Sequence, residues 1–122
     1  MIVQWSMDRV IAVSTDLFFA ARIRSAAQAA GTSVRFIGRA DDLPSSAPSL
    51  ALVDLDSALD VAHIIAQLQS AGTPMIVAFG PHLDTEKFSA ARGAGAHRVL
   101  ARSKFVTELP ALMRSVSTLA PS

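Results

Sequence analysis

The feature of this sequence that most constrains its fold is an alternation between short apolar runs and longer segments with helical periodicity. Three of the runs, Val10–Val13, Leu50–Val53 and Pro74–Phe79, contain no polar position, as is typical of parallel strands buried on both faces. Ser33–Ile37 has one alternating polar position, and His97–Ala101 is more polar, which indicates a strand at a sheet edge. The pattern therefore predicts five strands.

Segments with the spacing of amphipathic helices separate these strands. We expect helices over Leu17–Ala30, Ala58–Ser70 and from Thr85 to about Ala91. The segment 38–48 is rich in Pro, Ser and Asp, and it has room for one helical turn at most. Strands that alternate with helices in this way predict a parallel sheet covered by helices on both faces.

The last helix is expected to begin near Thr107. With Thr107 as the N-cap, Pro110 falls in the first turn, and a proline deeper in a helix costs about 3 kcal/mol. The apolar face of this helix consists of Leu109, Leu112, Met113 and Val116.

Composition limits the classes of protein to which the chain can belong. The 122 residues suit one domain, and 51% hydrophobic with 17% charged residues excludes disorder. The net charge of +1 gives no electrostatic reason to expect nucleic-acid or membrane binding. The absence of cysteine removes disulfides and cysteine–metal sites. No segment has the pattern of a signal peptide or membrane span, so we expect a cytoplasmic domain.

Three short segments resemble the response-regulator receiver domain, a flavodoxin-like (CheY-like) α/β fold. Leu52-Val53-Asp54-Leu55 resembles its third strand, which ends in the phosphoacceptor aspartate. Thr73–Val77 resembles the fourth strand, and Ala94-Gly95-Ala96 the Gly-Ala before the fifth. The resemblance covers about residues 9–116 of a single domain, 1–122. It implies a doubly wound five-stranded parallel sheet of order 2-1-3-4-5, with helices on both faces and a shortened second helix.

The phosphorylation residues of the receiver family are largely replaced. A receiver has two adjacent acids after the first strand, and these positions correspond here to Ser14 and Thr15, with Asp16 one place late. All three are residue types that cap helices. Of the standard set, only Asp54 is kept.

The fourth and fifth strands depart from the family in the same way. Phe79 occupies the position usually held by Thr or Ser. The usual Lys-Pro is replaced by Arg102 and Ser103, and Lys104 lies two places beyond.

These replacements remove the groups that phosphoryl transfer to an aspartate needs. The transfer builds negative charge, which Mg²⁺ and a lysine normally neutralise. Mg²⁺ prefers carboxylate and water oxygens, and the hydroxyls of Ser14 and Thr15 are weak substitutes. The resemblance therefore implies a degenerate receiver, or pseudo-receiver, with no catalytic residue, cofactor or metal site.

Three residues of the expected binding rim have alternative interpretations. Asp54 is either a phosphoacceptor or anion-pocket carboxylate, or the partner of Arg102 or, failing that, Lys104. Asp56 is either a rim acid or part of a helix cap. His82 belongs to a recognition loop, a one-histidine metal site or an ordinary loop. The full rim comprises Ser14, Thr15, Asp16, Asp54, Asp56, Phe79, His82, Arg102, Ser103 and Lys104.

Three functions are consistent with this sequence. The first is a non-catalytic module for two-component signalling or protein interaction, and the receiver resemblance implies that it docks a partner through residues from about Phe88 to Val116. The polar fifth strand and apolar last helix also predict a weak homodimer through this face. The alternatives are an atypical response regulator phosphorylated at Asp54, with Asp16 supplying part of the metal site, and a flavodoxin-like small-molecule binder.

Overall fold

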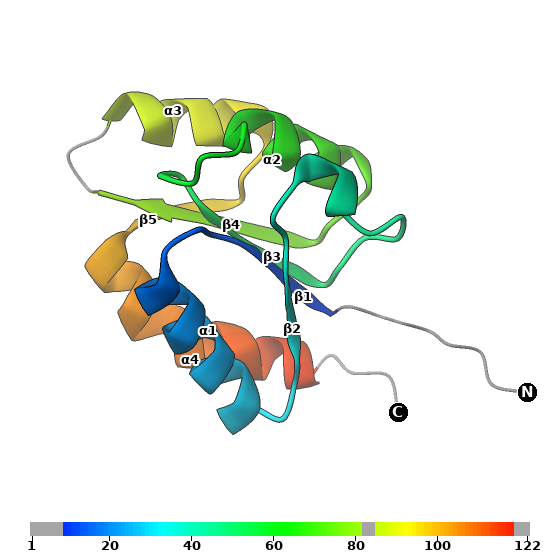
Figure 1. Cartoon of the computed structure of the whole chain (residues 1–122), viewed down its shortest axis with the longest axis vertical. Coiled ribbons are helices and arrows are strands. Elements are labelled where there is room, and N and C mark those ends of the chain that lie inside the picture. Colours follow the sequence, from blue (N-terminus) through cyan, green and yellow to red (C-terminus); the bar gives the residue numbers. More distant parts are fainter. Residues whose placement is uncertain (1–8, 82–84, 119–122) are drawn as a thin grey trace, which may run out of the picture.

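The computed structural model describes residues 9–81 and 85–118. Strands and helices alternate along the chain in the expected manner (Figure 1). In chain order the elements are β1 (Val10–Val13), α1 (Leu17–Ala29), β2 (Val34–Phe36), the 3-10 turn η1 (Ala40–Asp42), β3 (Leu50–Asp54), α2 (Val61–Ser70), β4 (Met75–Gly80), α3 (Thr85–Ala94), β5 (Arg98–Ala101) and α4 (Arg102–Thr118).

The five strands form one parallel sheet in the order β2-β1-β3-β4-β5. Helices α1 and α4 cover one face of this sheet, and α2 and α3 cover the other (Figure 1). The predicted fold class is therefore confirmed, including the strand order and the shortened second helical segment, which is reduced to η1.

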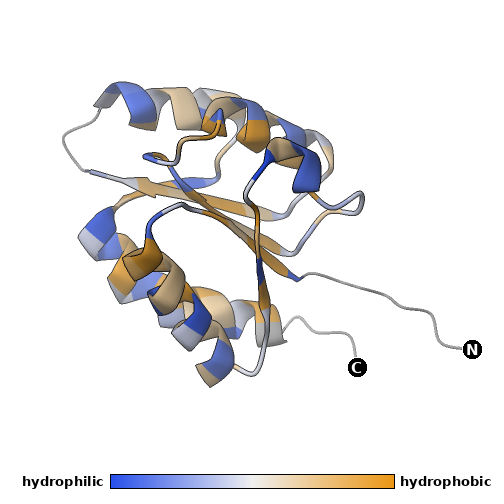
Figure 2. Ribbon diagram, viewed as in Figure 1, coloured by the Kyte–Doolittle hydropathy of each residue, from blue (hydrophilic) through white to orange (hydrophobic). Residues whose placement is uncertain are grey.

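Alternation along the buried strands divides the core between the two faces. Leu50 and Leu52 pack in the cluster that includes α1 and α4, whereas Ala51 and Val53 pack against α2 and α3. All of these side chains are almost completely buried. The apolar sheet between more polar outer helix surfaces is visible in Figure 2, and it explains why the strands read as continuous apolar runs.

Side chains at the starts of two helices satisfy backbone N–H groups there. Asp16 caps α1, and it is one of the three residues after β1 whose types were expected to cap a helix. Asp60 caps α2 by accepting a hydrogen bond from the backbone N–H of His63, at 3.2 Å. Helix α2 therefore begins at Val61, three residues later than expected.

The predicted start of the last helix is wrong. Helix α4 begins at Arg102, directly after β5, and Pro110 lies inside it. The early start brings Phe105 and Leu109 onto the same buried face, and both are almost completely buried. Pro110 is exposed, so the backbone N–H that it lacks would lie on the solvent side of the helix. A proline inside a helix costs about 3 kcal/mol. The burial of Phe105 in the core offsets this cost.

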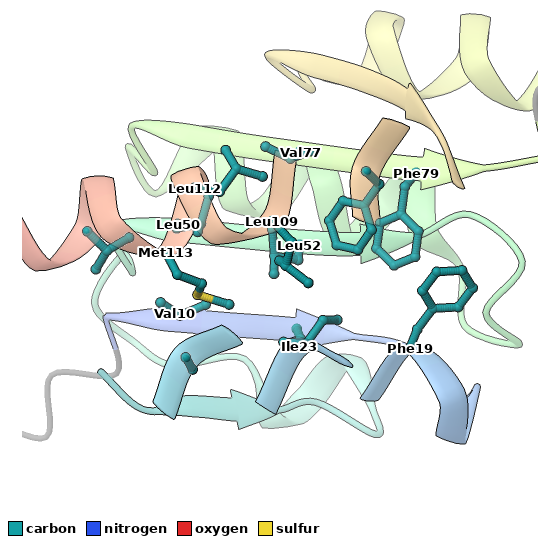
Figure 3. Packing of buried hydrophobic residues seen from close by; sticks show 14 residues of the cluster. Val10, Phe19, Ile23, Leu50, Leu52, Val77, Phe79, Leu109, Leu112 and Met113 are labelled. Carbon is teal, nitrogen blue, oxygen red and sulfur yellow. The ribbon is translucent and has the colours of Figure 1, made fainter. Parts of the chain in front are cut away.

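The apolar face of α4 packs against the sheet of its own chain. Leu109, Leu112, Met113 and Val116 all belong to the core cluster (Figure 3 labels Leu109, Leu112 and Met113). The apolar character of this helix is therefore no argument for a dimer, and weak dimerisation through this face stays a prediction.

Candidate functional site

The predicted site residues converge on the carboxyl edge of the sheet, where β1, β3, β4 and β5 end. Ser14 follows β1, Asp54 is the last residue of β3, and Arg102 directly follows β5. Phe79 lies opposite Asp54 in the β3–β4 register. In open α/β sheets this edge is where ligands bind.

Asp54 is a buried carboxylate satisfied by its own chain. It is 1% exposed. The Ser14 hydroxyl donates to its Oδ2 at 2.9 Å, and the backbone N–H of Asp56 donates to its Oδ1 at 2.9 Å. A buried charge requires such partners, and both oxygens of this carboxylate have one.

The Asp16 carboxylate is engaged away from Asp54. Its Oδ1 accepts hydrogen bonds from the backbone N–H groups of Phe18, at 2.8 Å, and Phe19, at 3.3 Å. The backbone N–H of Asp16 in turn donates to Ser14 Oγ at 3.2 Å. Thr15 is exposed. The residues after β1 thus serve to start α1 and to fix the Ser14 hydroxyl.

The side chains at this edge do not fit the Mg²⁺ ion that the standard receiver residues would hold. Mg²⁺ requires near-octahedral coordination by hard oxygens, usually from carboxylates and water. Beside Asp54 stands the neutral hydroxyl of Ser14, and the carboxylate of Asp16 caps a helix. Within residues 9–81 and 85–118, His, Asp and Glu side chains form no group of three or more suited to a metal ion.

Arg102 pairs with Asp56, so the predicted pair with Asp54 is wrong. Arg102 Nη2 lies 2.6 Å from Asp56 Oδ2, and Lys87 Nζ lies 2.8 Å from Asp56 Oδ1. The side chain of Asp56 is 33% exposed, so pairing there costs less desolvation than pairing with buried Asp54. Asp56 is therefore a rim acid, and its interpretation as a helix cap is also wrong, because Asp60 caps α2.

Lys104 is also directed away from Asp54. Its Nζ lies 3.3 Å from Glu108 Oε2, while Arg98 Nη1 lies 2.6 Å from Glu108 Oε1. The hydrogen bond from Arg98 is the main reason that the pKa of Glu108 lies below its usual value, and the same bond raises the pKa of Arg98. Ser103 is exposed, and its backbone carbonyl accepts a hydrogen bond from the Thr107 hydroxyl.

Phe79 is part of an aromatic cluster beneath the carboxyl edge. Its ring stacks on Phe105 at 3.8 Å between centroids and 5° between planes, and it lies 5.2 Å from the ring of Phe19. Figure 3 shows Phe79 and Phe19 extending toward each other from β4 and α1. The guanidinium of Arg102 lies 5.3 Å from the Phe19 ring centroid. Phe79, which the sequence resemblance placed at a position usually held by Thr or Ser, is thus a core residue.

The carboxyl edge has a small open cleft between the β3–α2 loop, α2 and α3. Its volume is about 280 Å³, and its lining includes Leu55, Ile65 and Ala91 with Asp60 and Lys87. This lies just below the range of about 300–1,000 Å³ that is usual for small-molecule pockets. His82, which was predicted on the binding rim, lies outside the described residues.

Sequence reasoning missed three contributors to this edge. Lys87 was not selected because it lies on α3, outside the segments that resemble receiver motifs. Phe19 was expected only as part of a helix, and Phe105 lay before the expected start of the last helix. The available signal was that Phe79, Phe19 and Phe105 each lie near the end or start of an element at this edge.

Comparison with known proteins gives structural similarity alone. No protein-family model matches the chain, and no curated protein is similar to it in sequence. The receiver domain of NtrX from Brucella abortus superposes with a TM-score of 0.71 at 16% identity, over 91% of this chain and 99% of that one. The BeF3-activated DrrB receiver domain gives a TM-score of 0.73 at 14% identity, over 90% and 97%.

A CheY-like receiver domain protein from Methanospirillum hungatei covers 94% of this chain and all of its own, with a TM-score of 0.70 and 12% identity. The chain has the receiver fold. The structural agreement extends over nearly the whole sequence. None of the helices in the described part of the chain has the length and apolar character to cross a membrane.

Proposed function

We propose that this chain is a non-catalytic signalling or protein-interaction module built on a degenerate receiver fold. The observation that supports the proposal is the state of Asp54. Its carboxylate is 1% exposed, and both of its oxygens accept hydrogen bonds from the chain itself. Asp54 thus acts as a structural link between the end of β3 and the residue after β1.

The charges around Asp54 support the same proposal. Phosphorylation would place additional negative charge on this carboxylate, and that charge needs cations or hydrogen-bond donors aimed at it. The two cations nearby, Lys87 and Arg102, both pair with Asp56. At the position of the usual hydroxyl donor stands the ring of Phe79, which is completely buried.

An atypical phosphoacceptor is the second candidate function. Two observations favour it. Asp54 is the last residue of β3, and the cations Lys87 and Arg102 lie nearby, paired with Asp56. In both candidates the chain acts on a protein partner in the cytoplasm.

Intact-mass measurement distinguishes the two candidates. The full chain is incubated with Mg²⁺ and acetyl phosphate, beside an Asp54→Asn variant. The cyanobacterial phytochrome response regulator RcpA, whose crystal structure is known in the phosphorylated form, serves as the positive control. We expect RcpA to gain the mass of a phosphoryl group and this chain to remain unmodified. A stoichiometric, Mg²⁺-dependent gain that Asp54→Asn abolishes would overturn the proposal in favour of the second candidate.

A further inference from the structure

Two large apolar side chains are exposed at the start of α1. Leu17 is 86% exposed and Phe18 is 57% exposed. The guanidinium of Arg22, one turn later, lies 5.1 Å from the Phe18 ring centroid. Clustered exposed apolar side chains flanked by polar groups are typical of protein contact sites.

An open groove adjoins this apolar end. It has a volume of about 240 Å³ and lies between α1 and α4, the two helices on the same face of the sheet (Figure 1). Its lining consists of Arg22, Ser25 and Ala26 from α1 and Val106, Leu109 and Pro110 from α4. Phe18 precedes Arg22 by four residues, so it lies on the groove side of α1.

The helices that form the groove are basic. Together α1 and α4 contain five Lys and Arg residues and one acidic residue, Glu108, and one of the five, Arg102, is paired with Asp56 at the carboxyl edge. Glu108 is already paired with Arg98 and Lys104. Arg114 follows Pro110 by four residues and therefore lies on the same side of α4. Neither Arg22 nor Arg114 has a carboxylate partner among the described residues.

We propose that this surface, the α1/α4 face, docks an acidic amphipathic helix of a protein partner. The face is defined by Phe18, Arg22, Val106, Pro110 and Arg114. An amphipathic helix would place apolar side chains against Phe18 and the groove, and acidic side chains beside the arginines. The inference rests on the proposed function, since it names the partner class of that interaction module.

Charge and shape argue against the other occupants of this face. A second copy related by a two-fold axis would bring the same arginines toward each other, and like charges at an interface are unfavourable. A nucleic-acid backbone would meet the arginines but would leave the exposed ring of Phe18 without apolar contacts. An acidic helix satisfies both features.

Titration of the full-length ¹⁵N-labelled chain with synthetic peptides tests the proposal. The probe is an amphipathic peptide with leucines at helical spacing flanked by glutamates. The matched control peptide has lysines in place of the glutamates, and a short DNA duplex tests nucleic-acid binding. Arg22→Glu perturbs the face, and Arg92→Glu makes the same change at an exposed position of α3 on the opposite side of the sheet.

We expect the acidic peptide to shift the amide signals of α1 and α4 saturably. Affinity should fall by about tenfold or more for the lysine peptide and for Arg22→Glu, and it should be unchanged for Arg92→Glu. The inference would be overturned if both peptides bound equally, if the shifts were confined to α2 and α3, or if no binding occurred. It would also be overturned if both variants lost affinity equally or if DNA bound more tightly than the acidic peptide. Phosphorylation of Asp54 would instead overturn the proposed function and leave this binding result unaffected.

Discussion

Removing the Ser14 hydroxyl should destabilise the domain because that hydroxyl is a hydrogen-bond donor to a buried charge. In Ser14→Ala, Asp54 Oδ2 loses the partner that now lies 2.9 Å away. Hydrogen bonds to charged groups contribute about 1.5–3 kcal/mol. Ser14 is only half-buried, so water can partly replace it, and we expect a loss of about 1–2 kcal/mol.

Urea unfolding measures this loss. With an m-value of about 2 kcal/mol/M, the midpoint should fall by roughly 0.5–1 M. Thr15→Ala is the matched control, because Thr15 is the exposed neighbour of Ser14, and its cost should stay below about 0.5 kcal/mol.

A double-mutant cycle isolates the contact from the other effects of the change. Ser14 Oγ also accepts a hydrogen bond from the N–H of Asp16. Ser14→Ala removes this bond whether or not Asp54 is also replaced by Ala, so its contribution cancels in the cycle. The coupling energy should be about 1 kcal/mol or more. A coupling near zero, or equal midpoints for Ser14→Ala and Thr15→Ala, would refute the structural role of Asp54.

Three further predictions concern the neighbours of this site. Phe79→Thr should cost about 3–5 kcal/mol in urea unfolding because the ring is fully buried in the aromatic cluster; a cost below about 1 kcal/mol would contradict its place in the core. The coupling between Asp56 and Arg102 in a double-mutant cycle should be about 0.2–1 kcal/mol, since both side chains are a third or more exposed, and several kcal/mol would contradict this. The lowered pKa of Glu108 means that its contribution is present above its ordinary value near 4.5 and is lost as the pH falls through the folded-state value. Glu108→Gln should therefore lower the melting temperature at neutral pH and match the unaltered chain in acid, and a constant difference would count against it.

The sheet was predictable because its signal is local. A parallel strand buried on both faces must be apolar throughout, and Val10–Val13 and Leu50–Val53 show this directly in the sequence. The helix cap at Asp16 was equally local, because a capping side chain bonds to N–H groups two and three residues ahead.

The start of α4 could not be read from local propensity. Proline alone favours a helix that begins near Thr107, but the stack of Phe105 on Phe79 joins residues that are far apart in the sequence. Tertiary packing decides the boundary, and no periodicity within the last helix contains that information.

The position of the candidate site was predictable, whereas its pairing was not. The ends of β1, β3 and β5 must meet at one edge, so Ser14, Asp54 and Arg102 were expected together. Which carboxylate Arg102 contacts depends on how deeply each carboxylate is buried. Asp54 is 1% exposed, whereas the side chain of Asp56 is 33% exposed. The exposure of residues at the end of a strand is set by the folded structure around them, so the sequence alone does not reveal it.

A Mg²⁺ titration observed through the backbone amide signals of Ser14, Asp54 and Asp56 tests the central claim most directly. If the Asp54 carboxylate is a structural acceptor for Ser14 and for the backbone of Asp56, these signals should show no saturable shift through the millimolar range of Mg²⁺. Ca²⁺ at equal ionic strength controls for nonspecific screening. A saturable, Mg²⁺-specific shift of the three signals that is lost in Asp54→Asn would contradict the account.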